Sequence, residues 1–295
     1  MPLPSRRAAP RWAPEPPVEL PPGRVVHVPG RGELFVRDSG GDGPAVLLLH
    51  GWTASADLNF YAQYDALAAA GLRVIAIDHR GHGRGLRTYV DFRLEDCADD
   101  AVALAEHLGV APVLAAGYSM GGPVALLAAR RHPEAVRGLV LCATSSNWRS
   151  LRIRGLWWSM AWFRLWLGIA PYGIWRSGLR LAGLPDTATT TWMAAELVRG
   201  SARDVAEAGR ELGRFDARPW LADIRQRAAV VVTRDDHAVP PRWQRGLASG
   251  LGARTFETPG DHFACGEHPE TFNAALLAAL DHVARSAAPA AQRAA

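Results

Sequence analysis

The chain has 295 residues and is 48% hydrophobic, which suits one large α/β domain or a domain with an insertion. Its net charge is +4, with 29 acidic residues interleaved among 33 arginines and no lysine. Because this charge is scattered along the sequence, we expect no nucleic-acid partner. The three cysteines lack the spacing of a metal site, so they indicate a reducing compartment and no bound metal.

The two ends of the chain differ in composition from the rest. Residues 1–23 contain eight prolines and three arginines, and residues 286–295 are rich in alanine. We therefore predict a disordered Pro-rich tail over residues 1–23 and a second disordered tail over residues 286–295. The first segment has no apolar run of the kind found in signal peptides, so we expect a cytoplasmic protein.

The run Gly117-Tyr118-Ser119-Met120-Gly121 reads G-x-S-x-G and is the most informative feature of the sequence. Residues 112–116 predict a buried strand before it, and residues 122–130, rich in Ala and Leu, predict a helix after it. A serine on a sharp strand-to-helix turn exposes its hydroxyl at the top of a sheet. The flanking glycines suit the tight backbone of such a turn, which makes Ser119 a candidate nucleophile.

The next feature is a long connection. Roughly 85 residues separate the predicted strand at 138–142 from the predicted strand at 229–233, whereas a plain crossover unit needs only about 30. We predict an inserted helical cap over residues 145–221, which holds eight of the 11 tryptophans. Five apolar residues of this segment recur at helical spacing and predict one face, here named the Trp face: Trp158, Trp162, Leu165, Trp166 and Ile169.

Three interpretations of the Trp face remain open. It packs the cap onto the body, it covers an active-site cleft as an apolar lid, or it contacts a membrane surface, where Trp and Arg suit the interface. Arg154 and Arg164 interrupt the stretch, and the charge-free run 165–175 is far shorter than the ~20 residues of a membrane-spanning helix. Membrane contact is therefore expected to be at most peripheral.

Two late segments supply a carboxylate and a histidine. Residues 228–233 predict a buried strand that leads to Asp235 and Asp236, and residues 254–257 predict a short strand that leads to His262. Both loops follow the carboxyl ends of strands, the edge where open α/β sheets keep their active sites. A serine hydroxyl needs a base to take its proton, and a carboxylate commonly orients that base.

Five motifs in this order resemble those of the α/β-hydrolase family, over about residues 24–285. They are His50-Gly51-Trp52, the D-x-R-G-x-G run 78–83, the elbow 117–122, the D-x-x-V-P run 236–240, and Asp261-His262-Phe263. The resemblance implies an α/β fold with a mostly parallel central sheet, helices on both faces and a helical cap insertion. The core would comprise residues 24–144 and 222–285.

The resemblance also implies roles for single residues. Ser119 matches the nucleophile, Asp236 the acid and His262 the base, and the backbone amides of Trp52 and Met120 match the oxyanion hole. No cofactor and no metal are implied. The indole of Trp52 either forms a wall of the acyl pocket or only packs its loop.

Neighbouring residues offer alternatives to these assignments. Asp235 is an alternative acid, although the D-x-x-V-P register favours Asp236. His237 lies too close to the acid to reach the serine, and His268 precedes a proline at the expected start of the last helix. Three further histidines are expected to position loops: His50, His79 and His82.

The residues and the resemblance together predict a serine hydrolase that cleaves a carboxylic ester or thioester of a moderately apolar small molecule through an acyl-enzyme. Ser119 argues against epoxide hydrolases and haloalkane dehalogenases, which use an aspartate nucleophile. Two serine-based alternatives stay open, a cofactor-free haloperoxidase-like perhydrolase and a carbon–carbon bond hydrolase. The chain departs from the carbon–carbon bond hydrolases at Tyr118, where they usually have Asn, and at Phe263, where they usually have Trp. A catalytically silent ligand-binding protein of this fold is the alternative from another class. The acyl and alcohol groups and the oligomeric state stay open.

Overall fold

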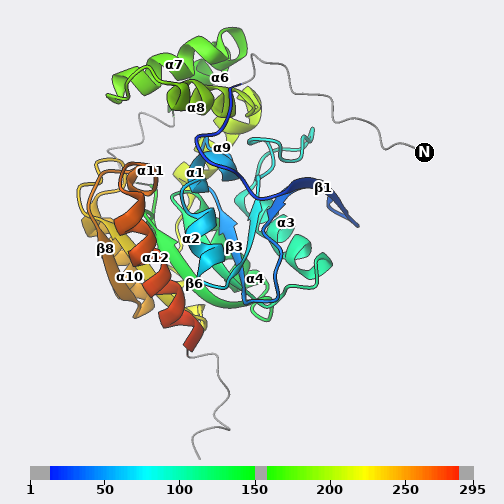
Figure 1. The fold of residues 1–295 in the computed structure, drawn as a ribbon, viewed down its shortest axis with the longest axis vertical. Coiled ribbons are helices and arrows are strands. Elements are labelled where there is room, and N and C mark those ends of the chain that lie inside the picture. Colours follow the sequence, from blue (N-terminus) through cyan, green and yellow to red (C-terminus); the bar gives the residue numbers. More distant parts are fainter. Residues whose placement is uncertain (1–13, 150–157, 286–295) are drawn as a thin grey trace, which may run out of the picture.

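The computed structural model describes residues 14–149 and 158–285, so the predictions for residues 1–13, 150–157 and 286–295 lie outside the described residues. Eight strands of the described part form one sheet in the order β1-β2-β4-β3-β5-β6-β7-β8 (Figure 1). Their bounds are β1 (Gly23–Val28), β2 (Gly32–Asp38), β3 (Ala45–Leu49), β4 (Arg73–Ile77), β5 (Val113–Tyr118), β6 (Val136–Cys142), β7 (Arg227–Thr233) and β8 (Arg254–Thr258).

The sheet is mostly parallel, as predicted. Only the pairings β1–β2 and β2–β4 are antiparallel, whereas β4, β3, β5, β6, β7 and β8 pair in parallel in that order. The central strand β3 reads Ala-Val-Leu-Leu-Leu and is buried at every position. A continuous apolar run of this kind is typical of a parallel strand that is covered on both faces.

Helices cover both faces of the sheet, again as predicted. One apolar core lies under α3 (Leu94–His107), α4 (Gly121–Arg131) and α10 (Pro241–Leu251). The other core lies under α1 (Ala56–Phe60), α2 (Tyr64–Ala69), α11 (Ala264–Glu267) and α12 (Pro269–Ala284). Because each face of the sheet has its own core, the strands are held rigidly and their carboxyl ends give a fixed base for a site.

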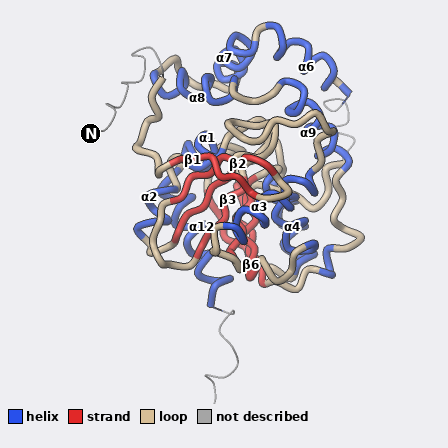
Figure 2. The backbone as a smooth tube through the Cα atoms, turned by 90° about the vertical axis from the view of Figure 1, so that its right-hand side faces the viewer, coloured by secondary structure: helices blue, strands red, loops and turns tan. Residues whose placement is uncertain are grey.

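The described residues between β6 and β7 include four α-helices, here called the inserted helices. They are α6 (Met160–Ile169), α7 (Pro171–Leu181), α8 (Ala188–Val198) and α9 (Ala202–Arg214). In both views α6, α7 and α8 form a layer beyond the end of the sheet, and α9 returns toward the core (Figures 1 and 2). Among the inserted helices, α6 packs against α9, and α7 packs against α8.

The Trp face does not pack onto the body, which overturns the first of the three interpretations. All five of its residues are exposed to solvent on the outer side of the inserted helices. The buried side of α6 carries Met160 and Leu167 instead. The helical period of the sequence was correct, but the more apolar side of α6 is the one that faces water.

Residues just before β1, which we predicted to be disordered, make defined contacts with the core. β1 begins at Gly23, and Leu20 is already packed against the core. Arg37 donates to the carbonyl of Pro21 at 2.7 Å, and Asp38 donates its backbone N–H to the carbonyl of Pro22 at 3.1 Å. A Pro-rich segment without regular structure is therefore held by its carbonyl groups, which proline retains.

Candidate active site

Ser119 lies on a sharp turn between β5 and α4. Its φ angle is 52°, in the left-handed region that non-glycine residues rarely occupy. A Cβ atom at Gly117 would collide with the carbonyl oxygen of Gly121, and one at Gly121 would collide with the carbonyl oxygen of Leu49. The G-x-S-x-G pattern is thus required by close backbone contacts on both sides of the serine.

The structure brings Ser119, His262 and Asp236 together from three separate loops. His262 Nε2 lies 3.0 Å from Ser119 Oγ, and His262 Nδ1 lies 2.8 Å from Asp236 Oδ2. A proton on Nδ1 directed at the carboxylate leaves Nε2 as an acceptor for the serine hydroxyl. This is the geometry of a nucleophile beside a base that a carboxylate orients.

Asp236 is held by a buried network that the sequence did not reveal. Its Oδ1 accepts from the Val239 backbone N–H at 2.7 Å, and its Oδ2 accepts from Thr233 Oγ1 at 2.8 Å. Gln244 Nε2 also donates to Oδ2, at 3.2 Å. Thr233 and Gln244 carry no motif, but they end the preceding strand and begin the following helix α10. The carboxylate is therefore fixed in position although it is buried.

The alternative acid and bases lie elsewhere. Asp235 is exposed and accepts from the backbone N–H of Gly260 at 3.0 Å. The exposed ring of His237 is bound to Asp261, with Nδ1 and Oδ2 2.9 Å apart. His268 is the residue just before the first turn of α12, as its position before a proline predicted, and its side chain makes no capping hydrogen bond. None of these three side chains contacts Ser119 in the described structure.

The two residues expected to supply backbone amides flank the serine. Met120 is the cap residue of α4, and the first N–H groups of a helix have no acceptor within the helix itself. Trp52 lies in the loop after β3, where the side chain of Asn59 accepts from the Gly51 N–H at 2.7 Å. Asn59, which the sequence did not single out, therefore sets the position of this loop.

Trp52 does more than pack its own loop. It lines the cavity beside Ser119, and its Nε1 donates to the carbonyl of Val205 in α9 at 2.7 Å. Trp52 therefore joins the loop after β3 to the inserted helices.

Three buried histidines cluster behind the site. The ring of His50 lies 4.3 Å from that of His79 and 5.5 Å from that of His82, and His50 Nε2 accepts from the His79 backbone N–H at 2.9 Å. Burial lowers the pKa of His79 to about 3 and that of His82 to about 4, and it lowers the pKa of His50 well below its usual value. All three are neutral at pH 7, and none of them lines the cavity beside Ser119.

The cysteine near the base is not activated. Cys265 is buried, and burial raises the pKa of its thiol to about 12. Asn59 Nδ2 lies 3.5 Å from its sulfur. A protonated thiol without access to solvent is a packing residue and not a second nucleophile.

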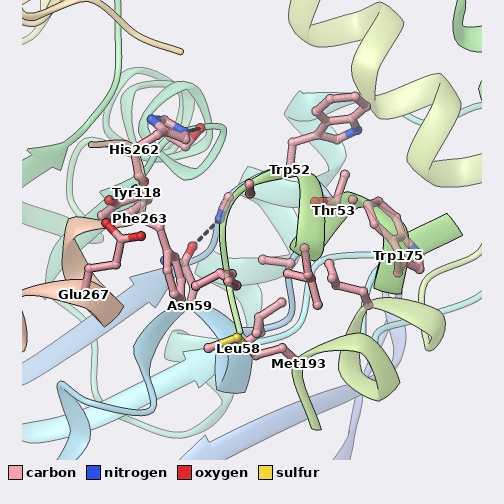
Figure 3. A pocket seen from close by; sticks show the side chains of 18 residues that line it. Trp52, Thr53, Leu58, Asn59, Tyr118, Trp175, Met193, His262, Phe263 and Glu267 are labelled. Atoms are coloured by element: carbon pink, nitrogen blue, oxygen red, sulfur yellow. Dashed lines mark hydrogen bonds between the residues drawn. The ribbon is translucent and has the colours of Figure 1, made fainter. Parts of the chain in front are cut away.

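A cavity of about 430 Å³ opens beside Ser119 and His262. Figure 3 shows His262 and Phe263 on one side of it and Trp175 on the other. Its walls are mainly apolar, and the residues from the inserted helices and their connections are Trp175, Gly178, Leu179, Ala182, Leu184, Met193 and Leu197. No residue of the Trp face lines it, so the lid interpretation is wrong for those residues.

Two features are absent from residues 14–149 and 158–285. No helix there is long and apolar enough to cross a membrane. No group of three or more His, Cys, Asp or Glu side chains there is arranged to hold a metal ion.

Comparison with known proteins places this chain in a family. Residues 44–170 match the family model for the alpha/beta hydrolase fold. A non-heme haloperoxidase from Rhodococcus erythropolis is 30% identical over 269 residues, which cover 84% of this chain and 96% of that protein. The chain therefore belongs to the α/β-hydrolase family of enzymes, as its motifs predicted.

Other relatives match over a shorter region. Epoxide hydrolase B from Mycobacterium tuberculosis is 36% identical over 121 residues, which cover 40% of this chain. The bifunctional esterase/perhydrolase DCH from Acinetobacter calcoaceticus is 35% identical over 103 residues, which cover 35% of this chain. The chain spans about a third of the length of each, 34% and 37% respectively.

Solved structures confirm the fold. An esterase from Exiguobacterium antarcticum superposes with a TM-score of 0.77 at 20% identity, covering 88% of this chain and 99% of its own. A bromoperoxidase from Bacillus anthracis superposes with a TM-score of 0.76 at 19% identity, covering 88% of this chain and 100% of its own.

Proposed function

We propose that this enzyme hydrolyses carboxylic esters or thioesters of moderately apolar small molecules through an acyl-enzyme on Ser119. One observation carries the proposal. A serine hydroxyl, an imidazole and a buried carboxylate are hydrogen-bonded in series at the wall of an apolar cavity. An apolar cavity with a few convergent polar groups is the usual form of a small-molecule site.

In the first half-reaction Ser119 Oγ attacks the carbonyl carbon of the ester, and its proton passes to His262 Nε2. Asp236 stabilises the imidazolium that forms. The backbone N–H groups of Met120 and Trp52 bind the oxyanion of the tetrahedral intermediate, and each such donor contributes roughly 3 kcal/mol. The bond to the leaving oxygen then breaks, and His262 returns the proton to the departing alkoxide.

In the second half-reaction water attacks the acyl carbon. His262 takes a proton from that water, and the tetrahedral intermediate breaks its bond to Ser119 Oγ. The proton returns to Ser119, and a carboxylic acid leaves. No cofactor enters either half-reaction.

A second candidate is perhydrolysis on the same acyl-enzyme. It is favoured by the relatives whose names include haloperoxidase and perhydrolase. Hydrogen peroxide would take the place of water, and the product would be a peroxy acid instead of a carboxylic acid. The same three residues serve both reactions, so the nucleophile that attacks the acyl group is the only difference.

A chromogenic ester series of increasing acyl length tests the proposal, together with a serine-reactive phosphonate probe. We expect turnover and labelling by the wild-type protein and neither by Ser119→Ala. Added hydrogen peroxide divides the product between acid and peroxy acid and so measures the second candidate. A folded wild-type protein that neither labels nor turns over any ester would overturn both candidates and indicate a silent ligand-binding protein.

A further inference from the structure

The outer side of the inserted helices carries an exposed aromatic surface. Trp158, Trp162 and Trp166 are 80%, 66% and 53% exposed. Ile169 at the end of α6 and Leu181 at the end of α7 are 66% and 90% exposed. Large apolar side chains that are exposed side by side, and not singly, mark an interaction surface.

The net charge of this surface is positive. Residues 158–184 contain three arginines, Arg164, Arg176 and Arg180, and no acidic residue. Asp186, just beyond α7, pairs with Arg176 and Arg180. Arg164 is exposed in the middle of α6, and no carboxylate of the described residues lies within ion-pair distance of it.

These features distinguish the two partners that an apolar surface commonly has. A second copy of the chain would form a two-fold interface, which places the same patch on both sides and so brings arginines toward arginines. An anionic lipid surface supplies the opposite charge, and Trp rings and Arg side chains both suit the headgroup region. The net positive charge of this surface therefore favours an anionic lipid surface over a second copy of the chain.

The place of this surface beside the cavity adds a second argument. Trp175, Gly178 and Leu179 lie on one side of α7 and line the cavity, as does Ala182 at the end of the helix. Leu181 of the same helix is exposed. α7 thus carries both wall residues of the cavity and an exposed apolar side chain.

We propose that the outer face of α6 and α7 docks reversibly on anionic lipid surfaces. The tryptophans enter the headgroup region, and Arg164 contacts the lipid phosphates. Docking by itself needs no catalysis. If the proposed ester hydrolysis also holds, docking brings the cavity close to a phase in which apolar esters are concentrated.

Co-sedimentation and tryptophan fluorescence with two kinds of vesicle test this proposal. We expect binding and a blue shift with vesicles of phosphatidylcholine and phosphatidylglycerol, weakened by salt, and little binding to phosphatidylcholine alone. The double variant Trp162→Ser/Trp166→Ser should bind at least about tenfold more weakly, and Arg164→Glu about fivefold or more. All three side chains are exposed, so both variants should fold.

Two controls separate docking from other causes. Tyr89→Ser removes an aromatic side chain that is 99% exposed on the loop before α3, and it should leave vesicle binding unchanged. Ser119→Ala should bind vesicles as the wild type does, so that loss of turnover is not mistaken for loss of docking. Failure of the wild type to bind anionic vesicles would overturn the proposal. Self-association that the double Trp variant abolishes, without vesicle binding, would show instead that the surface joins two copies.

Discussion

Arg84 of the core and Glu196 of α8 form an ion pair that ties the inserted helices to the sheet. The two guanidinium nitrogens of Arg84 lie 3.0 and 2.9 Å from the two carboxylate oxygens of Glu196. Ser55 Oγ, in the loop before α1, donates to the same carboxylate at 3.0 Å. Glu196 is buried, and Arg84 follows directly after the D-x-R-G-x-G run. The residue that follows this run therefore fixes α8, and with it the layer of inserted helices, to the core.

The ion pair between Arg84 and Glu196 predicts that loss of Glu196 strongly lowers stability. Glu196→Ala leaves the guanidinium of Arg84 without its main partner in a half-buried position, and we expect a loss of about 3 kcal/mol in the free energy of unfolding. Urea denaturation measures it. Glu211→Ala is a matched control, because Glu211 pairs with Arg214 on the surface of α9, and it should cost less than about 1 kcal/mol. Equal losses in the two variants would contradict a bracing role for Glu196.

The buried network around Asp236 predicts which of two adjacent acids serves the histidine. Asp236→Asn should lower kcat by several orders of magnitude, because an amide in that position favours the wrong tautomer of His262. Asp235→Asn should change kcat by less than about threefold, since the hydrogen bonds of Asp235 within the described residues go to the Gly260 backbone of the neighbouring loop. Steady-state kinetics on one chromogenic ester compares the two. The reverse ranking would assign the acid to Asp235.

The family and the fold could be predicted from the sequence because their signals are local. The backbone contacts of Gly117 and Gly121 leave little choice of residue, so the turn at Ser119 is visible as a short pattern. The loops after β7 and β8 were equally recognisable, because each follows an apolar strand. The placement of Ser119, Asp236 and His262 at one edge then follows from the parallel sheet.

The environment of the Trp face could not be predicted in the same way. Helical spacing shows which residues share a face, but it does not show whether that face meets the core, the cavity or water. The side chains that hold the loops were missed for a related reason. Asn59 and Gln244 act through contacts that only the folded chain creates, and polar residues of these types occur throughout the sequence.

The cavity walls predict where chain-length preference resides. Trp175 and Leu179 of α7 line the cavity, whereas Trp158 and Trp162 do not. Trp175→Ala/Leu179→Ala should shift the preferred acyl length upward and change kcat/KM for long chains by roughly tenfold, since each variant opens apolar volume. Labelling by a small phosphonate should stay nearly the same. The double variant Trp158→Ala/Trp162→Ala should change neither the preferred acyl length nor the labelling. An equal shift of acyl-length preference in the two double variants would contradict this account of the cavity.

The histidine cluster behind the site predicts how stability depends on pH. In the unfolded chain a histidine has a pKa near 6.5, whereas burial lowers the pKa of His82 to about 4 and that of His79 to about 3. As the pH falls below about 6.5, the unfolded state therefore binds protons that the folded state excludes. Asp78 has the opposite effect. Burial raises its pKa from 3.8 to about 6, so it binds its proton first in the folded state.

Burial also raises the pKa of Asp100 and Asp204, but the three histidines carry the larger shifts, so the free energy of unfolding should fall as the pH is lowered from about 6.5 to about 4. Each histidine contributes a slope of up to about 1.4 kcal/mol per pH unit in that range. His82→Gln removes one titrating group and should reduce the slope by about that amount. His27→Gln, at an exposed position of the edge strand β1, is the matched control. Urea denaturation at a series of pH values gives the slopes, and identical slopes for wild type and His82→Gln would show that His82 takes up its proton in the folded state as easily as in the unfolded chain.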